Sequence, residues 1–273
     1  MFDLKNIIIN DSSENALLSF PDEFIDLVVT SPPYDDLRSY HNSMNIWNYD
    51  IFKVIAKELS RVLKPGGVIV WVISDKIKNG SLSCTSMKHA LYFVEECKLN
   101  LNDEMIWKQL NPMPRVKTCR YSHCYEKMFV FSKGKPKTFN PIMRECKSAG
   151  VHYKSTVKNM GGENGRKKID YHVNKETIDY NIWDIAVAPN KTIYKNSKGE
   201  DIKHPAVFPI EIPLRHIKTW SNEGNLVLDP FAGSGTTLIA AKQLNRNYIG
   251  IEQNPDYCDI ITQRLDNEPV SLF

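Results

Sequence analysis

The sequence predicts an α/β fold with a mostly parallel sheet and helices on both of its faces. Runs of apolar, β-branched residues alternate with amphipathic helical stretches along much of the chain. One run, residues 68–73, is apolar throughout, which is typical of a strand covered on both faces. Residues 225–252 follow the pattern strand, glycine-rich turn, helix, strand, a βαβ unit. The length of 273 residues suits one large α/β domain or two small ones.

Composition excludes several classes of protein. Apolar residues make up 42% and charged residues 25% of the chain, as in ordinary globular domains. The formal net charge of +3 is too small to imply a nucleic-acid partner by itself. The start of the chain lacks a signal-peptide pattern, and the longest apolar run, residues 68–73, is too short to span a membrane. We therefore expect a cytoplasmic protein with no membrane attachment.

The six cysteines do not suggest a metal site or a disulfide framework. They are scattered, and no C-x-x-C pair is present. Cys119, His123 and Cys124 lie close together, but a fourth ligand is not evident. We expect reduced thiols there and no bound metal.

The first expected strand ends in a carboxylate. Residues 6–11 read as a short strand, and a helical stretch then runs through Leu18. Asp11, Ser12 and Ser13 can cap that helix. Asp11 is therefore either a helix cap or a ligand-contacting acid at the carboxyl end of a strand.

The remaining elements of the first half follow from the same patterns. Residues 50–63 carry an apolar helical stripe, and the Lys-Pro-Gly-Gly stretch at 64–67 is expected to stop it. The other expected elements are strands at residues 24–29, 68–73, 104–107 and 127–131 and a helix at residues 86–97.

The strand of residues 24–29 runs directly into Thr-Ser-Pro-Pro-Tyr at residues 30–34. Two prolines stop ladder hydrogen bonding and fix φ, so the chain leaves the sheet as a stiff, extended turn. Ligands bind at the carboxyl ends of strands in open α/β sheets. The Ser31 hydroxyl, the Pro32 carbonyl and the Tyr34 ring would suit a planar ring that carries an amino group. The alternative is an ordinary strand-to-loop exit.

The βαβ unit of residues 225–252 favours a nucleoside cofactor. Gly233 and Gly235 allow close approach of the backbone to a ligand at a helix N-terminus. Glu252 ends the second strand, where an acid can bind the two hydroxyls of a ribose. The third glycine of G-x-G-x-x-G and the P-loop lysine are both missing. A cofactor with ribose and no phosphates is therefore favoured over a dinucleotide or a triphosphate.

Basic residues concentrate in the middle of the chain. Residues 134–180 contain ten basic and five acidic residues, a net charge of +5, without strong periodicity. Tyr153, Tyr171 and two histidines are interleaved with them. Such a mixture suits a polyanion whose bases can stack, although a solvated insertion gives the same pattern.

Taken together, these motifs resemble those of the DNA amino-methyltransferases that use S-adenosylmethionine. Residues 30–34 resemble the catalytic motif, residues 229–237 the cofactor loop, and residues 204–209 the segment that wraps the methionine end of the cofactor. The catalytic motif comes first, which is the permuted, β-type order. The resemblance covers residues 3–265 and implies a Rossmann-like methyltransferase fold with circularly permuted motif order.

The resemblance also implies domains and site residues. Residues 1–133 would be the catalytic part of the domain, 134–182 the target recognition insertion and 183–273 the cofactor-binding part. The implied catalytic residues are Ser31, Pro32, Pro33 and Tyr34. The implied cofactor-binding residues are Asp11 (adenine), Glu252 (ribose), Pro205, Phe208, Asp229, Phe231, Gly233, Ser234, Gly235 and Thr236. The expected DNA-binding residues are Arg115, Lys117, Arg166, Lys167 and Lys168.

The function implied is methyl transfer to an exocyclic amine of a flipped base in double-stranded DNA. Ser31 favours N4 of cytosine, since the family commonly has Ser there in cytosine enzymes and Asp in adenine enzymes; N6 of adenine is the alternative. Methylation of RNA or of a protein amide, and a catalytically silent DNA-binding subunit, are the other classes considered. A cognate restriction endonuclease acting on the same site is a candidate partner. The recognised DNA sequence and the oligomeric state stay open.

Overall fold

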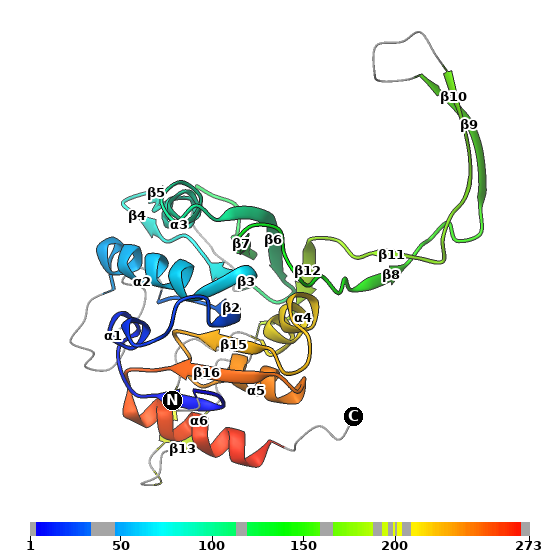
Figure 1. The fold of residues 1–273 in the computed structure, drawn as a ribbon. Helices are drawn as coiled ribbons and strands as arrows, with labels where there is room; N and C mark the ends of the chain where they lie inside the picture. The colour runs from blue at the N-terminus through cyan, green and yellow to red at the C-terminus, as the bar shows by residue number, and fades with distance from the viewer. Residues whose placement is uncertain are drawn as a thin grey trace. The chain divides into compact units, whose positions relative to one another are not determined.

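The computed structural model describes residues 4–33, 47–112, 119–158, 166–187, 193–195, 199, 201–203 and 209–268 (Figure 1). The chain divides into two compact units. The larger unit comprises Met1–Asn140 and Asn181–Phe273, and the smaller unit is Pro141–Tyr180. Within the described residues, no helix is both long and apolar enough to cross a membrane.

The larger unit is built on an eight-stranded sheet with the order β1-β16-β15-β2-β3-β7-β6-β12 (Figure 1). Every neighbouring pair is parallel except the two pairs that β7 makes, with β3 and with β6. The predicted mostly parallel sheet is therefore confirmed. The strands are β1 (Ile7–Ile9), β2 (Ile25–Thr30), β3 (Leu63–Ile73), β6 (Asn100–Gln109), β7 (Tyr125–Ser132), β12 (Ile182–Ile185), β15 (Leu226–Asp229) and β16 (Asn247–Ile251).

Helices cover both faces of this sheet, as predicted. Apolar residues of one face pack with α1, α2 and α3, and those of the other face with α5 and α6. Alternation along the edge strand shows the division, since Ile7 and Ile9 join the first cluster and Ile8 the second. The helices are α1 (Ser13–Leu18), α2 (Tyr49–Val62), α3 (Thr85–Glu95), α4 (Glu211–Trp220), α5 (Thr236–Gln243) and α6 (Pro255–Asn267).

The two ends of the chain complete one sheet. β15 pairs with β2, and β16 pairs with β1, so strands from the last quarter of the sequence lie between strands from the first. Because β1, β16, β15, β2 and β3 are all parallel, their carboxyl ends meet at one edge. This edge collects the sequence motifs that lie far apart along the chain.

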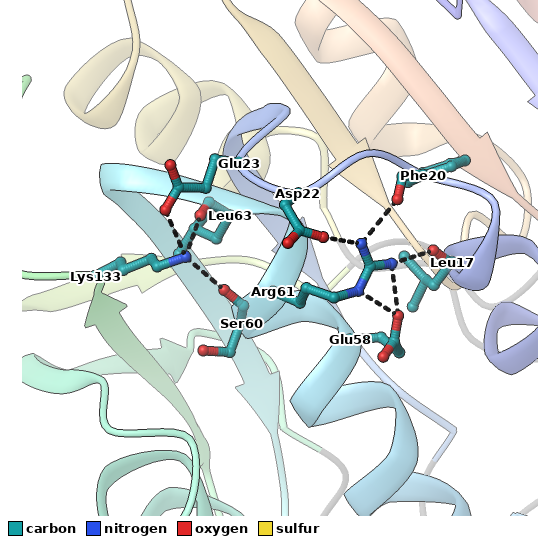
Figure 2. Close-up of polar contacts among 9 residues, drawn as sticks. All are labelled: Leu17, Phe20, Asp22, Glu23, Glu58, Ser60, Arg61, Leu63 and Lys133. Carbon is teal, nitrogen blue, oxygen red and sulfur yellow. Dashed lines mark hydrogen bonds and ion pairs between the residues drawn. The ribbon is translucent and has the colours of Figure 1, made fainter.

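The opposite, amino-end edge is held by cations at the end of α2 (Figure 2). The Arg61 guanidinium donates to the carbonyls of Leu17 at 2.9 Å and Phe20 at 2.8 Å, just where α1 ends. It also pairs with Asp22 at 2.5 Å and Glu58 at 2.6 Å. A cation that satisfies helix-end carbonyls and two carboxylates at once fixes the position of α1 against α2.

Lys133 acts in the same way on the end of α2 itself. Its ammonium donates to the carbonyls of Ser60 at 3.1 Å and Leu63 at 3.0 Å, and it pairs with Glu23 at 3.4 Å (Figure 2). Lys133, the residue after β7, therefore holds the connection between α2 and β3 in place.

This connection differs from the sequence expectation. The helix does end at Val62, but residues 64–67 belong to β3 and form no separate turn. The Gly66 N–H donates to the Lys133 carbonyl at 2.7 Å, so tertiary pairing makes a strand from a Pro-Gly-Gly stretch. Gly66 has a φ of +78°, and a β-carbon there would lie 2.9 Å from the Lys137 side chain, so glycine fits this position.

The smaller unit consists of two antiparallel strand pairs (Figure 1). β8 (Met143–Glu145) pairs with β11 (Glu176–Ile178), and β9 (His152–Lys158) pairs with β10 (Arg166–His172). The Asp179 N–H donates to the Ile142 carbonyl at 2.9 Å, which closes the base of the unit. The sequence showed no strong periodicity here, and the ribbon side chains whose burial is described do not alternate between buried and exposed; Tyr153 and Tyr171, for instance, are 44% and 51% exposed.

Two short hairpins complete the described elements. β4 (Ile77–Lys78) pairs with β5 (Ser81–Leu82), and β13 (Ile193–Lys195) pairs with β14 (Asp201–Lys203).

Candidate active site

The Thr-Ser-Pro-Pro motif leaves the sheet at its centre. β2 lies between β15 and β3 and ends at Thr30, which is fully buried. Ser31 and Pro33 are half-buried and Pro32 is buried, so these three residues are embedded in the edge of the sheet. Tyr34 lies outside the described residues.

The glycine-rich turn folds between β15 and α5, beside the end of β16. The Ala232 N–H donates to the Ile251 carbonyl at 2.9 Å, and the Gly235 N–H to the Ala232 carbonyl at 2.7 Å. Gly235 has a φ of +82°, and a β-carbon there would lie 2.9 Å from the Ile261 side chain. Ser234 and Thr236 are buried where the turn enters α5.

Glu252 follows β16 and contacts this turn directly. Its two carboxylate oxygens accept from the Gly233 N–H and the Asn254 N–H, each at 2.9 Å. Burial disfavours the charged form and raises the pKa of Glu252 to about 7, although these two N–H donors act in the opposite direction. The structure thus brings the expected ribose acid and the glycine turn within hydrogen-bond distance.

Asp229, the first residue of the cofactor motif, is 1% exposed. One carboxylate oxygen accepts from the Thr30 hydroxyl at 2.6 Å and from the Phe231 N–H at 3.0 Å. Burial raises the pKa of Asp229 to about 6. Its described contacts join protein segments to one another.

Asp11 lies at the same edge, beyond the end of β1, and is exposed. Its carboxylate accepts from the Ser12 N–H at 2.7 Å and from the Asn15 side chain at 3.3 Å, so it makes a local turn before α1. The residue at the N-cap position of α1 is Ser12, and its side chain makes no capping hydrogen bond, so Asp11 is not the helix cap. The assignment of Asp11 to the adenine of the cofactor is still a proposal. Sequence reasoning missed Ser13, whose hydroxyl donates to the Pro230 carbonyl and ties α1 to the cofactor turn.

Two further groups at this edge escaped the sequence reasoning. The Trp47 ring packs edge-on against Phe231 of the cofactor turn, with centroids 5.2 Å apart. Asp75, which follows β3, accepts from the Ser86 N–H at 3.0 Å and from the Ser86 hydroxyl at 2.5 Å. The signal for Asp75 was available, because it is the first acid after the apolar run of residues 68–73.

Of the other predicted site residues, some have a described backbone and the rest lie outside the described residues. Arg166, Lys167 and Lys168 lie in β10, paired in register with residues 156–158 of β9. Among the described residues, no group of three or more His, Cys, Asp or Glu could hold a metal ion. The predicted residues outside the described part of the chain are Tyr34, Arg115, Lys117, Pro205 and Phe208.

Hydrogen-bond acceptors and the glycine-rich turn lie at the same carboxyl-end edge of the sheet. A neutral hydroxyl and a proline carbonyl follow one strand, and a half-buried acid that accepts from the N–H of Gly233 follows another. Such an arrangement can position a nucleoside next to a second, amine-bearing ring.

Comparison with known proteins agrees with this geometry. Residues 25–263 match the family model described as DNA methylase. The chain is 43% identical over 246 residues to the orphan methyltransferase M.BamHII of Bacillus amyloliquefaciens, covering 89% of each chain. It is 28% identical over 281 residues to the type II methyltransferase M.HinfI of Haemophilus influenzae, covering 96% of this chain and 69% of that protein.

Solved structures show the same fold. The PvuII DNA methyltransferase, described as cytosine-N4-specific, superposes with a TM-score of 0.69 at 22% identity, over 99% of this chain and 92% of the other. A DNA modification methylase of Thermus thermophilus, solved with S-adenosyl-L-methionine, gives a TM-score of 0.59 at 22% identity, over 97% and 96% of the two chains. The match to the DNA methylase model over residues 25–263 and the 43% identity to M.BamHII show that this chain belongs to the DNA methylase family.

Proposed function

We propose that this DNA methyltransferase transfers a methyl group from S-adenosylmethionine to the exocyclic N4 amine of cytosine in duplex DNA. The observation that carries the proposal is the placement of Ser31 and Pro32 at the end of the central strand β2, next to the turn that Glu252 contacts. The Bacillus amyloliquefaciens relative, named a methyltransferase, supports the reaction class.

Ser31 and Pro32 supply what the reaction needs from the protein. An aromatic amine is a poor nucleophile because its lone pair is delocalised into the ring. Acceptors aimed at both of its N–H groups favour the pyramidal geometry that returns the lone pair to nitrogen. The Ser31 hydroxyl oxygen and the Pro32 carbonyl are two such acceptors, and the proline-fixed turn preorganises them. A base in a duplex must be flipped out to reach them.

Glu252 and the glycine turn would hold the cofactor. The Glu252 carboxylate would accept from the ribose hydroxyls, and the turn would let the backbone approach the nucleoside. When bound, S-adenosylmethionine supplies an electrophilic methyl group on a sulfonium. Holding that group in line with the amine contributes to the rate through positioning.

The preference for cytosine rests on the family resemblance, since Ser is common at this position in cytosine enzymes and Asp in adenine enzymes; the chemistry of the hydroxyl explains why Ser can replace Asp. A hydroxyl can accept from the amine or donate to the neighbouring ring nitrogen, N3 of cytosine, which a carboxylate would repel. N1 of adenine occupies the corresponding place, so N6 of adenine is the second candidate target. A neutral hydroxyl also avoids placing a second charge in a dry pocket.

Nucleoside mass spectrometry tests the proposal. Purified protein is incubated with S-adenosylmethionine and duplex DNA, with RNA and a protein extract as parallel acceptors. The expected product is N4-methylcytosine in DNA alone. N6-methyladenine as the sole product would replace cytosine by the second candidate, and methylation confined to RNA or protein would overturn the proposal.

We further propose that the smaller unit contacts the DNA target. The smaller unit, residues 141–180, carries a net charge of +3, and its ribbon holds the consecutive residues Arg166, Lys167 and Lys168. Changing these three to Gln should weaken DNA binding and reduce the slope of log K against log salt by roughly 2–3. The matched control changes Lys57, Lys88 and Lys98, all exposed on the larger unit, and should leave that slope unchanged.

A further inference from the structure

Three buried polar side chains join the strand that ends in Ser31 to the cofactor turn. Thr30, Asp229 and Thr237 are 0%, 1% and 1% exposed. The Thr30 hydroxyl donates to Asp229 at 2.6 Å, and the Thr237 hydroxyl donates to the Val29 carbonyl at 3.3 Å. Burial raises the pKa of Asp229, and the Thr30 and Thr237 hydroxyls act in the opposite direction.

Each member of this trio is close in sequence to a group that the reaction uses. Thr30 directly precedes Ser31, Asp229 opens the cofactor turn, and Thr237 lies in the first turn of α5. The chain distance between Thr30 and Asp229 is 199 residues. The hydrogen bond between them therefore connects the part of the site that would hold the amine to the part that would hold the methyl donor.

A hydrogen bond between side chains joins β2 and β15 beyond the last residues that pair through their backbones. β2 and β15 are paired at Leu27 with Val227 and at Val28 with Leu228, and the recorded register stops there. Beyond those pairs, the Thr30 hydroxyl and the Asp229 carboxylate form the link. A hydrogen bond from a hydroxyl to a buried carboxylate is charge-assisted, and the low dielectric around it strengthens it.

A purely structural role explains only part of this arrangement. Asp229 already accepts from the Phe231 N–H, which is enough to shape the turn. A valine at position 30 would suit a buried strand equally well and would require no polar partner. The Thr30–Asp229 bond adds a fixed spacing between two strand ends, and displacements of about 1 Å in an active site can slow a reaction about 100-fold.

We propose that Thr30, held by Asp229, is a positioning residue for methyl transfer, which sets the Ser31–Pro32 acceptors relative to the cofactor turn. The inference rests on the proposed function and adds to it a residue that touches neither base nor cofactor. Loss of the hydroxyl should therefore slow the chemical step and leave both ligands bound.

The test compares Thr30→Val with Thr30→Ser in the full-length protein. Single-turnover methyl transfer is measured with DNA and S-adenosylmethionine both saturating, and calorimetry gives the cofactor affinity. Thr30→Val should slow transfer by about 10–100-fold with cofactor and DNA affinities within about twofold of the wild type. Thr30→Ser keeps the hydroxyl and should recover to within about threefold of the wild-type rate.

A matched control loses a buried hydroxyl elsewhere. Thr219 is 7% exposed in α4, where its hydroxyl donates to the Arg215 carbonyl at 2.8 Å. Thr219→Val should keep the wild-type rate. If Thr30→Val fails to fold, Thr30→Cys, in which a weak S–H donor replaces the hydroxyl, should give an intermediate loss of rate with intact cofactor binding.

Three results would overturn the inference: a wild-type rate in Thr30→Val, equal losses in the Val and Ser variants, or a loss of cofactor affinity that accounts for the whole effect. Total methyl transfer is scored whichever base accepts it. Transfer to adenine would therefore correct the proposed target, while the ratio of variant to wild-type rates would still test Thr30.

Discussion

The two edges of the same sheet differ in how their charged side chains are paired. At the amino-end edge, Arg61 meets two carboxylates and two carbonyls, and Lys133 meets one carboxylate and two carbonyls (Figure 2). At the carboxyl-end edge, the recorded partners of Asp229 and Glu252 are hydroxyl and backbone N–H donors. Burial raises the pKa values of these two acids to about 6 and about 7.

This difference separates stability from function within one fold. At the amino-end edge, Arg61 and Lys133 donate to backbone carbonyls that would otherwise lack a hydrogen-bond partner in the protein, so these cations stabilise the fold. At the carboxyl-end edge, burial disfavours the charged forms of Asp229 and Glu252, and under the proposed function the ribose hydroxyls would donate to Glu252. Removing a polar group should therefore reduce stability at the first edge and reduce activity or affinity at the second.

The largest effect is expected from Ser31→Ala at the carboxyl-end edge. One of the two proposed amine acceptors is lost, so single-turnover methyl transfer should fall by about 10²–10³-fold, by analogy with removal of one preorganised oxyanion donor. Cofactor affinity should not change. The control is Ser60→Ala, which removes a hydroxyl that donates to the Cys97 carbonyl at 3.1 Å near the other edge and should leave the rate intact. Equal rates for Ser31→Ala and wild type would remove Ser31 from the mechanism.

Glu252→Ala should weaken S-adenosylmethionine binding by roughly 2–4 kcal/mol, because charge-assisted hydrogen bonds to the ribose are lost in a desolvated site. Titration calorimetry on the folded variant measures this. Glu58→Ala is the matched change at the amino-end edge, where Glu58 pairs with Arg61, and it should leave the affinity unchanged. An unaltered affinity in Glu252→Ala would refute the ribose assignment.

Arg61→Ala should lower the free energy of unfolding by roughly 2–3 kcal/mol. The carbonyls of Leu17 and Phe20 lose their donor, and Glu58, 18% exposed, loses its partner. Urea unfolding gives the stability, and calorimetry on the same sample should return the wild-type cofactor affinity. A cofactor defect larger than the stability defect would contradict the separation of the two edges.

The smallest effect concerns pH. Burial raises the pKa of Glu252 from 4.5 to about 7, so between these values the folded chain holds a proton that the unfolded chain has released. The Glu252 contribution to stability is therefore fully present below pH 4.5 and falls as pH rises toward 7 and above. Glu252→Gln should shrink the stability difference between pH 5 and pH 8 by about 1–3 kcal/mol, since each pKa unit is worth about 1.4 kcal/mol and the side chain is half-buried. Urea unfolding at the two pH values measures it, and an unchanged difference would show that Glu252 is ionised throughout.

Much of the functional edge could be predicted because its groups end strands. Ser31 and Glu252 follow apolar runs, and parallel strands place such residues at one edge. The Thr30–Asp229 bond could not be predicted, because it joins residues 199 apart and depends on which strands are neighbours. The predicted start of the strand at residue 68 was wrong, because hydrogen bonds of Gly66 and Gly67 with Lys133 override the local turn propensity of residues 64–67.

The base of the smaller unit has a consequence for how the enzyme family can diversify. Pro141 and Tyr180 bound the unit, β8 and β11 pair just inside these ends, and the Asp179 N–H reaches the Ile142 carbonyl at 2.9 Å. Paired strands lie about 4.8 Å apart, so a turn of about two residues could close the chain if the whole unit were removed. A segment whose two ends lie this close together could be lengthened, shortened or exchanged as a cassette with little change in the path of the chain on either side. If this cassette reads the target, new sequence preferences can arise by recombination without altering the residues that carry out methyl transfer.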